Sequence, residues 1–257
     1  MSLTPPRRYW LTGASNGIGA SLAEEILKTG AHLAVSSRSL APLKALSQRY
    51  PGQVLVVAGD LTNGQRVREI GEQITEQWGS LDTMILNAGT CEYVDANQFD
   101  SSIIEHIVRT NLLASSYCIE AARSLLQAGT APHLVGMASS VTYLPLPRAE
   151  AYGDSKPGLR HLFESLRIDV EPENIEMTIV SPGLINTPLS KDVSHLNWSV
   201  DEAARYLFDK LKSRPRELPL PELLMPVLWP LPQKPGQTGL EIGKRMERNN
   251  PPIEGLP

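Results

Sequence analysis

A glycine-rich turn follows the first apolar run of the chain and limits the folds that the chain can adopt. The run YWLT (9–12) is typical of a strand, and TGASNGIG (12–19) leads directly into an apolar stripe with helical spacing over 18–27. The three glycines permit a tight turn and a close backbone approach, and the N-terminus of the following helix offers free N–H groups to a phosphate. A turn of this kind between a first strand and a first helix indicates a phosphate-binding βαβ unit.

The alternation of strand and helix continues through the first two-thirds of the chain. Continuous apolar runs of this length are typical of parallel strands that are covered on both faces. The predicted strands are 9–12, 32–37, 53–59, 82–89, 133–139 and 175–183. The alternation favours right-handed βαβ units and a Rossmann-like, doubly wound parallel sheet of the α/β class. We expect a single domain over 1–257, with its core at about 8–190 and a substrate loop and proline-rich extension at 191–257.

Three helices are predicted to begin at capping-box sequences, in which a serine or threonine is followed three residues later by glutamate or glutamine. The pairs are Thr62 with Gln65, Ser102 with Glu105, and Ser199 with Glu202. Two long helices are expected, at 102–128 and at about 152–170.

Bulk composition argues against several classes of protein. The formal net charge of −4 disfavours nucleic acid as the main partner. No segment resembles a signal peptide, and the apolar run 218–232 is too short and too rich in proline to be a transmembrane segment. Two cysteines, Cys91 and Cys118, predict neither a disulfide framework nor a zinc site and are typical of free thiols. We therefore expect a cytoplasmic protein without a metal.

The letters GASNG inside the turn also fit the G-x-S-x-G pattern of a hydrolase nucleophile, which would be Ser15. In those hydrolases an earlier strand–helix loop supplies half of the oxyanion hole. Only about a dozen residues precede Ser15, so there is no room for an earlier strand. The hydrolase interpretation is therefore disfavoured.

The spacing of the turn instead resembles the short-chain dehydrogenase/reductase family, whose opening motif is T-G-x-x-x-G-x-G. Motifs of that family follow in order over about residues 8 to 190: Asp60 in GDLT, Asn87-Ala88-Gly89, Asn111, Ser139, Tyr152 and Lys156 in Y-x-x-x-K, and Pro182-Gly183 followed by Thr187. A single Y-x-x-x-K is common by chance, whereas the ordered set is specific. The resemblance implies an oxidoreductase that interconverts a carbonyl and an alcohol by hydride transfer from or to a nicotinamide.

Tyr152 and Lys156 lie four residues apart, so a helix places one side chain over the other. Reduction of a ketone creates an alkoxide that needs a proton, and a tyrosine whose ordinary pKa is about 10 donates it readily only if that pKa falls. A lysine ammonium one turn away favours the tyrosinate, which predicts Tyr152 as the general acid/base. The resemblance implies that Lys156 also binds the nicotinamide ribose. Because Pro157 follows at once, we expect a kink or a water at the Gly153 carbonyl, with the catalytic turn intact.

Two further residues complete the catalytic set that the resemblance implies. Ser139 lies 13 residues before Tyr152 and would hold the substrate oxygen. Ser140 is the alternative, because shortening the loop 141–151 by one residue would promote it; Ser139 is preferred. Asn111 falls within a long helical pattern and is either a solvent-facing polar residue or, as the resemblance implies, the site of a helix distortion that orders water behind Lys156.

The second predicted strand ends in Ser36-Ser37-Arg38-Ser39, and no acidic residue lies between Glu25 and Asp60. In NAD-specific sites a carboxylate about 20 residues past the glycines binds the ribose 2′-hydroxyl, whereas an arginine accommodates the 2′-phosphate of NADP. Arg38 therefore favours NADP(H) over NAD(H), although Asn16 stands where NADP-using relatives often carry a basic residue, and Arg38 could be an ordinary surface arginine.

The remaining cofactor contacts follow from the resemblance. Asp60 would meet the adenine edge and Leu61 its ring, unless Asp60 caps the next helix instead. The expected cofactor-binding residues are Gly13, Ser15, Asn16, Gly17, Ile18, Gly19, Ser37, Arg38, Asp60, Leu61, Asn87, Ala88, Gly89, Tyr152, Lys156, Pro182, Gly183, Ile185 and Thr187.

The C-terminal part departs from the family pattern. Ten of the 21 prolines fall in the last 44 residues, and the glycine-bearing last strand of many relatives is not recognisable. A homodimer through the two long helices is therefore expected rather than a tetramer, which stays possible. The apolar run 218–232 favours an apolar ketone or aldehyde as substrate; it could form a lid, a subunit contact, a membrane-surface patch or a segment packed on its own domain.

Cys91 could border the substrate pocket, but a buried structural thiol is favoured. The alternative function is a dinucleotide-binding regulator without useful turnover.

Overall fold

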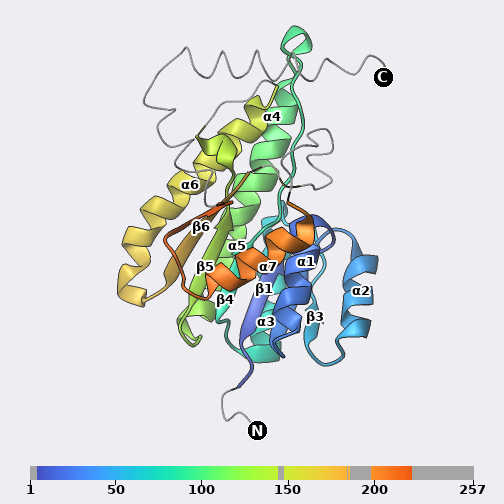
Figure 1. The fold of residues 1–257 in the computed structure, drawn as a ribbon, viewed down its shortest axis with the longest axis vertical. Helices are drawn as coiled ribbons and strands as arrows, with labels where there is room; N and C mark the ends of the chain where they lie inside the picture. Colours follow the sequence, from blue (N-terminus) through green and yellow to red (C-terminus); the bar gives the residue numbers. More distant parts are fainter. Residues whose placement is uncertain (1–4, 144–147, 184, 186–197, 222–257) are drawn as a thin grey trace.

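A parallel sheet of seven strands forms the centre of the protein (Figure 1). The computed structural model describes residues 5–143, 148–183, 185 and 198–221. The strand order is β3-β2-β1-β4-β5-β6-β7, which confirms the doubly wound arrangement. The strands are β1 (Arg8–Thr12), β2 (His32–Ser36), β3 (Val54–Val56), β4 (Thr83–Leu86), β5 (His133–Met137), β6 (Glu176–Pro182) and β7 (Glu217–Leu220).

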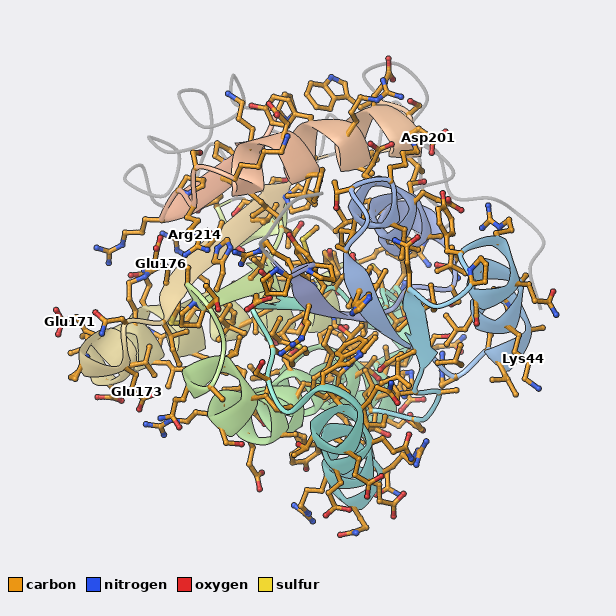
Figure 2. All side chains as sticks on the ribbon, turned by 90° about the horizontal axis from the view of Figure 1, so that it is seen from below. Lys44, Glu171, Glu173, Glu176, Asp201 and Arg214 are labelled. Atoms are coloured by element: carbon orange, nitrogen blue, oxygen red, sulfur yellow. The ribbon has the colours of Figure 1, made fainter. Side chains whose placement is uncertain are left out.

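Helices cover both faces of this sheet (Figure 2). One face carries α1 (Gly17–Leu27), α2 (Leu40–Arg49) and α7 (Val200–Leu211). The other carries α3 (Gly64–Trp78), α5 (Ala114–Gln127) and α6 (Glu150–Val170). Successive strand residues point to opposite faces, so Trp10 packs in the α3–α5–α6 layer and Leu11 in the α1–α2–α7 layer. Among the described residues no helix is both long and apolar enough to cross a membrane.

The remaining helical segments lie between these elements, and η4 leads from α6 into β6. They are α4 (Ser101–Val108), the π-helix η2 (Arg109–Leu113), and the short 3-10 helices η1 (Ala96–Gln98), η3 (Ser140–Thr142) and η4 (Glu171–Glu173). Helix α4 packs against α6 and continues through η2 into α5. The predicted long helix 102–128 is therefore present, with a distortion near its middle.

Strand β7 is a last strand that the sequence analysis did not predict, and it contains no glycine. It lies at the sheet edge inside the proline-rich segment and pairs in parallel with β6, with Leu218 opposite Val180. Proline lacks an N–H donor, so it is tolerated on an edge strand, where Pro219 lies. Gly183 N donates to Leu220 O over 2.7 Å and closes the pairing. The remainder of the apolar run, from residue 222 onwards, lies outside the described residues.

Two of the three predicted helix starts are wrong by one or two residues. The N-cap of α3 is Asn63, whose side chain accepts from Gln65 N and Arg66 N, and the N-cap of α4 is Asp100. Asparagine is a stronger N-cap than threonine, which accounts for α3, whereas aspartate and serine cap about equally well, so the residue type did not decide the start of α4. The capping box of Ser199 and Glu202 at α7 is confirmed.

Candidate active site

The glycine turn after β1 packs at distances that only glycine allows. Gly13 and Gly17 have φ of +68° and +53°, the left-handed region that favours glycine. A Cβ on Gly19 would lie 2.2 Å from Gly13 O, and one on Gly13 would lie 2.8 Å from Ala88 Cα. The turn, the start of α1 and the loop after β4 are therefore in direct backbone contact.

The start of α1 fits the pyrophosphate of a dinucleotide. Asn16 is the N-cap, and its side chain makes no capping hydrogen bond within the described part of the chain. The N–H groups of the first turn, at Gly17, Ile18 and Gly19, are therefore open to an anion, which the helix dipole also favours. Ser15 precedes this turn and is partly exposed.

Thr12, which the sequence reasoning missed, holds the loop after β4 against the glycine turn. Its Oγ1 accepts from Asn87 N and Ala88 N, each over 3.0 Å. In return, Asn87 Nδ2 donates to Thr12 O over 3.0 Å and to Gly13 O over 3.2 Å. These bonds draw residues 87–89 out of the sheet, so β4 ends at Leu86 and not at the predicted residue 89. The threonine of the T-G-x-x-x-G-x-G motif was the available signal.

Asn111 lies in the π-helix η2 and is fully buried. Its Nδ2 donates to Thr90 O over 3.0 Å and to Ser155 Oγ over 2.9 Å, and its Oδ1 accepts from Thr90 N over 2.8 Å. The expected helix distortion is confirmed, and the solvent-facing alternative is wrong. The side chain joins the loop after Gly89 to α6 through Ser155, another residue that the sequence reasoning missed.

Helix α6 carries Tyr152 and Lys156 on a continuous turn, because the helix runs from Glu150 to Val170 through Pro157. Lys156 Nζ lies 5.5 Å from the centroid of the Tyr152 ring and donates to Met137 O over 2.8 Å. The lysine is 4% exposed, and a Cβ on Gly89 would lie 3.3 Å from its Nζ and 3.2 Å from Asn111 Oδ1. Lys156, Asn111 and the loop after β4 therefore meet in one place. The kink at the Gly153 carbonyl stays a prediction.

The electrostatics of the pair differ from the expectation. Burial raises the pKa of Tyr152 to about 12, against a hydrogen bond with Ser139 that lowers it. Burial also lowers the pKa of Lys156 to about 8. The predicted fall in the tyrosine pKa is therefore not seen in this structure: loss of hydration outweighs any attraction from Lys156, whose ammonium is directed at the Met137 carbonyl.

Ser139 contacts Tyr152 at the carboxyl end of β5. Ser139 is 8% exposed and lies close enough to the Tyr152 hydroxyl to lower the pKa of that group, and its Oγ accepts from Val141 N over 3.3 Å. Ser140 begins the short helix η3 and is more exposed. The geometry therefore selects Ser139 over Ser140 as the partner of Tyr152.

Cys91 lies beside the same pair. Its thiol is partly exposed, which corrects the favoured interpretation of a buried structural cysteine. Burial still raises the pKa of Cys91, and the nearby Lys156 ammonium opposes that rise. Cys91 therefore borders the space around Tyr152 and Lys156.

The loops after β2 and β3 bring Arg38 near Asp60. Arg38 is exposed, and it contributes to holding the pKa of Asp60 below its usual range, although the largest cause is the hydrogen bond from Thr62 N. That bond to Asp60 Oδ1 measures 2.9 Å, so Asp60 closes a turn and does not cap α3. Ser37 and Leu61 are buried at 7% exposure each.

The loop after β6 completes the edge of the site. Pro182 ends β6, Gly183 bonds to β7, and Ile185 is 3% exposed and bridges to Trp198. Thr187 lies outside the described residues. All the other predicted site residues except Asn111, Tyr152 and Lys156 follow the carboxyl ends of β1 to β6, the edge at which open α/β sheets bind ligands.

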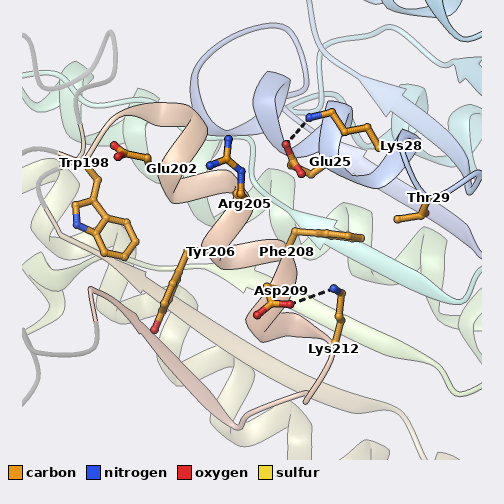
Figure 3. Close-up of a pocket in the computed structure, with 10 residues that line it drawn as sticks. All are labelled: Glu25, Lys28, Thr29, Trp198, Glu202, Arg205, Tyr206, Phe208, Asp209 and Lys212. Atoms are coloured by element: carbon orange, nitrogen blue, oxygen red, sulfur yellow. Dashed lines mark hydrogen bonds and ion pairs between the residues drawn. The ribbon is translucent and has the colours of Figure 1, made fainter.

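A wide groove of about 800 Å³ lies elsewhere, between α1 and α7 (Figure 3). It contains none of the predicted site residues. Lys28 pairs with Glu25 over 2.7 Å, Lys212 pairs with Asp209 over 3.1 Å, and Trp198 meets the Tyr206 ring edge-on at 5.0 Å. The charges that line it are therefore largely neutralised within the groove, which does not fit the phosphates of a dinucleotide.

Comparison with known proteins shows the family to which the chain belongs. A family model described as short chain dehydrogenase matches residues 9–197, well over half of the chain. The chain belongs to the short-chain dehydrogenase family. It is therefore an oxidoreductase of that family, whose members use a nicotinamide dinucleotide and small-molecule substrates.

Two relatives illustrate this membership. An oxidoreductase of Mycobacterium tuberculosis described as uncharacterized is 30% identical over 240 residues, which cover 89% of this short-chain dehydrogenase and 95% of the relative. The 11-beta-hydroxysteroid dehydrogenase-like protein 3 of Arabidopsis thaliana is 32% identical over 187 residues, which cover 70% of this chain and 59% of that protein.

Two solved structures share the fold. A short-chain dehydrogenase from Streptomyces avermitilis superposes with a TM-score of 0.80 at 20% identity, over 95% of this chain and 99% of that one. An alcohol dehydrogenase from the archaeon Thermococcus sibiricus, complexed with 5-hydroxy-NADP, gives a TM-score of 0.75 at 23% identity, over 84% and 96% of the two chains.

Proposed function

We propose that this short-chain dehydrogenase is an NADP(H)-dependent oxidoreductase that interconverts a carbonyl and an alcohol, with Tyr152 as general acid/base. The observation that carries the proposal is the meeting of Ser139, Tyr152 and Lys156 beside the loop 87–89 and the glycine turn. Each group has a role in the same step, and their side chains come from the turn after β5 and from α6.

When bound, the nicotinamide supplies or accepts the hydride. The residues of the chain handle the oxygen and the proton. Ser139 donates a hydrogen bond to the substrate oxygen, and Tyr152 gives that oxygen its proton during reduction. Because burial raises the pKa of Tyr152 to about 12, the phenol is protonated near neutral pH and begins the reduction as a proton donor. Lys156 is the ammonium beside the tyrosinate that results, and it would also hold the nicotinamide ribose.

Removal of the Tyr152 hydroxyl tests this role directly. Tyr152→Phe is expected to lower kcat by about a thousandfold, the scale of a lost general acid, while NADPH still binds. The measurement is NADPH absorbance with a panel of carbonyl substrates, accompanied by NADPH binding to both proteins. Substantial turnover by Tyr152→Phe would remove the tyrosine from its assigned role. Wild-type inactivity across a broad panel, with NADPH binding retained, would instead indicate a dinucleotide-binding regulator.

The preference for NADP(H) rests on charge at the end of β2. Arg38 is exposed there and close enough to Asp60 to lower the pKa of that carboxyl. An arginine at this place accommodates a 2′-phosphate. Wild type is therefore expected to bind NADPH more tightly than NADH, and Arg38→Ala is expected to lose most of that difference. Equal affinities in wild type would contradict the assignment and leave NAD(H) as the coenzyme.

The proposal extends to the substrate, the assembly and the location. An apolar ketone or aldehyde fits the apolar composition of 218–232, and one relative is named for hydroxysteroids. A homodimer would use α4–η2–α5 and α6, where Leu113 and Ile168 are 38% and 76% exposed. A cytoplasmic location agrees with the free thiols of Cys91 and Cys118. Light scattering on the purified chain would test the dimer.

A further inference from the structure

A polar cluster joins the turn after β5, helix α6 and strand β7. The Tyr143 hydroxyl donates to the Glu217 carboxylate and accepts from Arg160 Nη1 over 2.6 Å. Arg160 Nη2 donates to Glu217 Oε2 over 3.1 Å, and the guanidinium lies 5.4 Å from the centroid of the Tyr143 ring. Tyr143 is 8% exposed, and the Arg160 and Glu217 side chains are 19% and 22% exposed. We call these three residues the Tyr143 cluster.

Tyr143 ends a hydrogen-bonded turn that begins at Ser139. Thr142 N donates to Ser139 O over 3.1 Å, and Tyr143 N donates to Ser140 O over 3.0 Å. Within the same turn, Val141 N donates to Ser139 Oγ. These hydrogen bonds connect the residues of the turn to one another, so a contact that fixes the position of Tyr143 also restrains Ser139.

Helix α6 donates hydrogen bonds to both ends of the segment 137–143. Lys156 Nζ donates to Met137 O, two residues before Ser139. Arg160 lies one turn further along α6, on the same side of the helix, and bonds Tyr143. Ser139 therefore lies between two anchor points, and the second is tied to the edge strand through Glu217.

We propose that Tyr143 is a positioning residue, which fixes the Ser139 hydroxyl against Tyr152 by anchoring the turn 139–143 to Arg160 and Glu217. This inference rests on the proposed function, in which Ser139 holds the substrate oxygen. Hydrogen bonds to charged partners are stronger than neutral ones, so the Tyr143 hydroxyl is a firm anchor. Small displacements of a catalytic group lower the rate steeply, which makes such an anchor important for catalysis.

Tyr143→Phe is the first test, because phenylalanine keeps the ring against Arg160 and removes only the hydroxyl. We expect kcat to fall by about ten- to a hundredfold, the scale for a displaced catalytic group, with the NADPH dissociation constant unchanged. The double variant Ser139→Ala/Tyr143→Phe should be no slower than Ser139→Ala, because Tyr143 acts through Ser139. Fully additive losses in the double variant would overturn the proposal.

Glu164→Gln is the matched control. Glu164 lies one turn beyond Arg160 on α6 and pairs with Arg216, which precedes Glu217, so it joins the same two elements through an ion pair of its own, while its charge also acts on Arg160. It also pairs with Arg167 over 2.7 Å. Glu164→Gln should leave kcat near that of wild type. An equal loss in Glu164→Gln and Tyr143→Phe would show that only the general docking of β7 matters and would overturn the proposal.

A second readout does not depend on turnover. In protein labelled with ¹³Cζ-tyrosine, the Tyr152 signal is the one that disappears in Tyr152→Phe. We expect Ser139→Ala and Tyr143→Phe to move that signal in the same direction, and Glu164→Gln to leave it in place. If Tyr143→Phe does not fold, Glu217→Gln should produce a smaller shift of the same sign. An unmoved signal in the folded cluster variant would overturn this inference, whereas a wild type without carbonyl turnover would contradict only the proposed function.

Discussion

At the scale of single residues, the proton affinity of Tyr152 is set by competing surroundings. Burial and the neighbouring Cys91 raise the pKa of Tyr152, and the hydrogen bond with Ser139 lowers it. Lys156 is close to the ring, but its own pKa is lowered to about 8 by burial, so its charge is partly lost in mildly alkaline solution. Ser139 therefore has two roles in the proposed site, because it holds the substrate oxygen and also makes Tyr152 easier to ionise.

Ser139→Ala should separate these two roles in the alcohol-oxidation direction, which needs the tyrosinate form. Because the hydrogen bond from Ser139 lowers the pKa of Tyr152, its removal raises that pKa. The rise of kcat with pH should then move to higher pH, and kcat itself should fall by about a hundredfold, as for a lost oxyanion-hole donor. The measurement is the pH profile of kcat.

Ser140→Ala is the control for that experiment, since Ser140 is the adjacent hydroxyl and lies in η3. It should leave the pH profile and kcat close to those of wild type. If Ser140→Ala moves the profile and Ser139→Ala does not, the assignment of Ser139 is wrong.

Helix geometry predicted the pair whose spacing is local, and the family resemblance supplied Asn87 and Asn111, but neither indicated their distant partners Thr12 and Ser155. Tyr152 and Lys156 are four residues apart, so helix geometry alone brings them together. Ser155 was missed because its partner Asn111 is 44 residues away, and Thr12 was missed because it bonds Asn87, 75 residues away. Contacts over such separations depend on the packing of whole elements, which periodicity does not reveal.

At the scale of elements, the π-helix η2 places Asn111 where its side chain connects the loop after β4 to α6. Its side chain satisfies both Thr90 N and Thr90 O and also bonds Ser155 Oγ on α6. The resemblance implied water behind Lys156, whereas these contacts give Asn111 a structural role, in which it holds the loop that runs from Gly89 to Cys91. Both roles need the amide at this place.

Asn111→Ala should therefore destabilise the protein as well as the site. It leaves the partly buried Thr90 N and Thr90 O without their partner and removes one of the two hydrogen bonds of Ser155 Oγ, which still donates to Tyr152 O; each unsatisfied buried group costs about 1–3 kcal/mol. We expect the free energy of unfolding to fall by about 3 kcal/mol in urea. Asn63→Ala is the comparison, because Asn63 also accepts two backbone bonds but stands at the exposed N-cap of α3, where a loss of about 1 kcal/mol is usual. An equal loss in both variants would contradict the bridging role.

The element boundaries show where local patterns were insufficient. The predicted strand 53–59 is only Val54–Val56: Val57 N and Gly59 N still donate to Val35 O and Ser37 O, but Arg66 binds the Ala58 carbonyl over 2.7 Å. β7 was missed because Pro219 breaks the usual strand pattern, and only its place at the sheet edge makes proline acceptable. Long apolar runs were predicted well, whereas ends that are set by tertiary contacts were not.

At the scale of the whole molecule, the candidate site lies at the carboxyl ends of the parallel strands, and contacts that tie the strands together lie at their amino ends. The loops after β1 to β6 gather at one edge, where the candidate site lies, and this arrangement follows from strand–helix alternation alone. At the amino ends of the strands, side chains that the sequence analysis did not single out hold the sheet together. Asp82 accepts from Arg8 N over 2.8 Å and from Thr130 N over 2.7 Å and ties three strand starts together.

His133, at the amino end of β5, couples the stability of the whole molecule to pH. It is 3% exposed, and its Nε2 lies 2.8 Å from Thr178 Oγ1. Thr178 gives its own proton to Pro215 O over 2.6 Å, so the imidazole is the donor in this pair. Burial, helped by the nearby Arg214 and Arg7, lowers the pKa of His133 to about 3 from its ordinary value of about 6.5.

The sign of the resulting pH dependence follows from proton binding. Between pH 6.5 and pH 3 the unfolded chain binds a proton at His133 that the folded chain does not, so the free energy of unfolding falls as the solution becomes more acidic in this window. The slope from this residue approaches about 1.4 kcal/mol per pH unit. His133→Gln keeps a side-chain donor for Thr178 and cannot titrate, so its stability should fall less steeply than that of wild type between pH 6 and pH 4. Urea unfolding across that range measures the difference, with the exposed His161→Gln as the control. Parallel curves for wild type and His133→Gln would show that other titratable groups cause the fall in the free energy of unfolding at acidic pH.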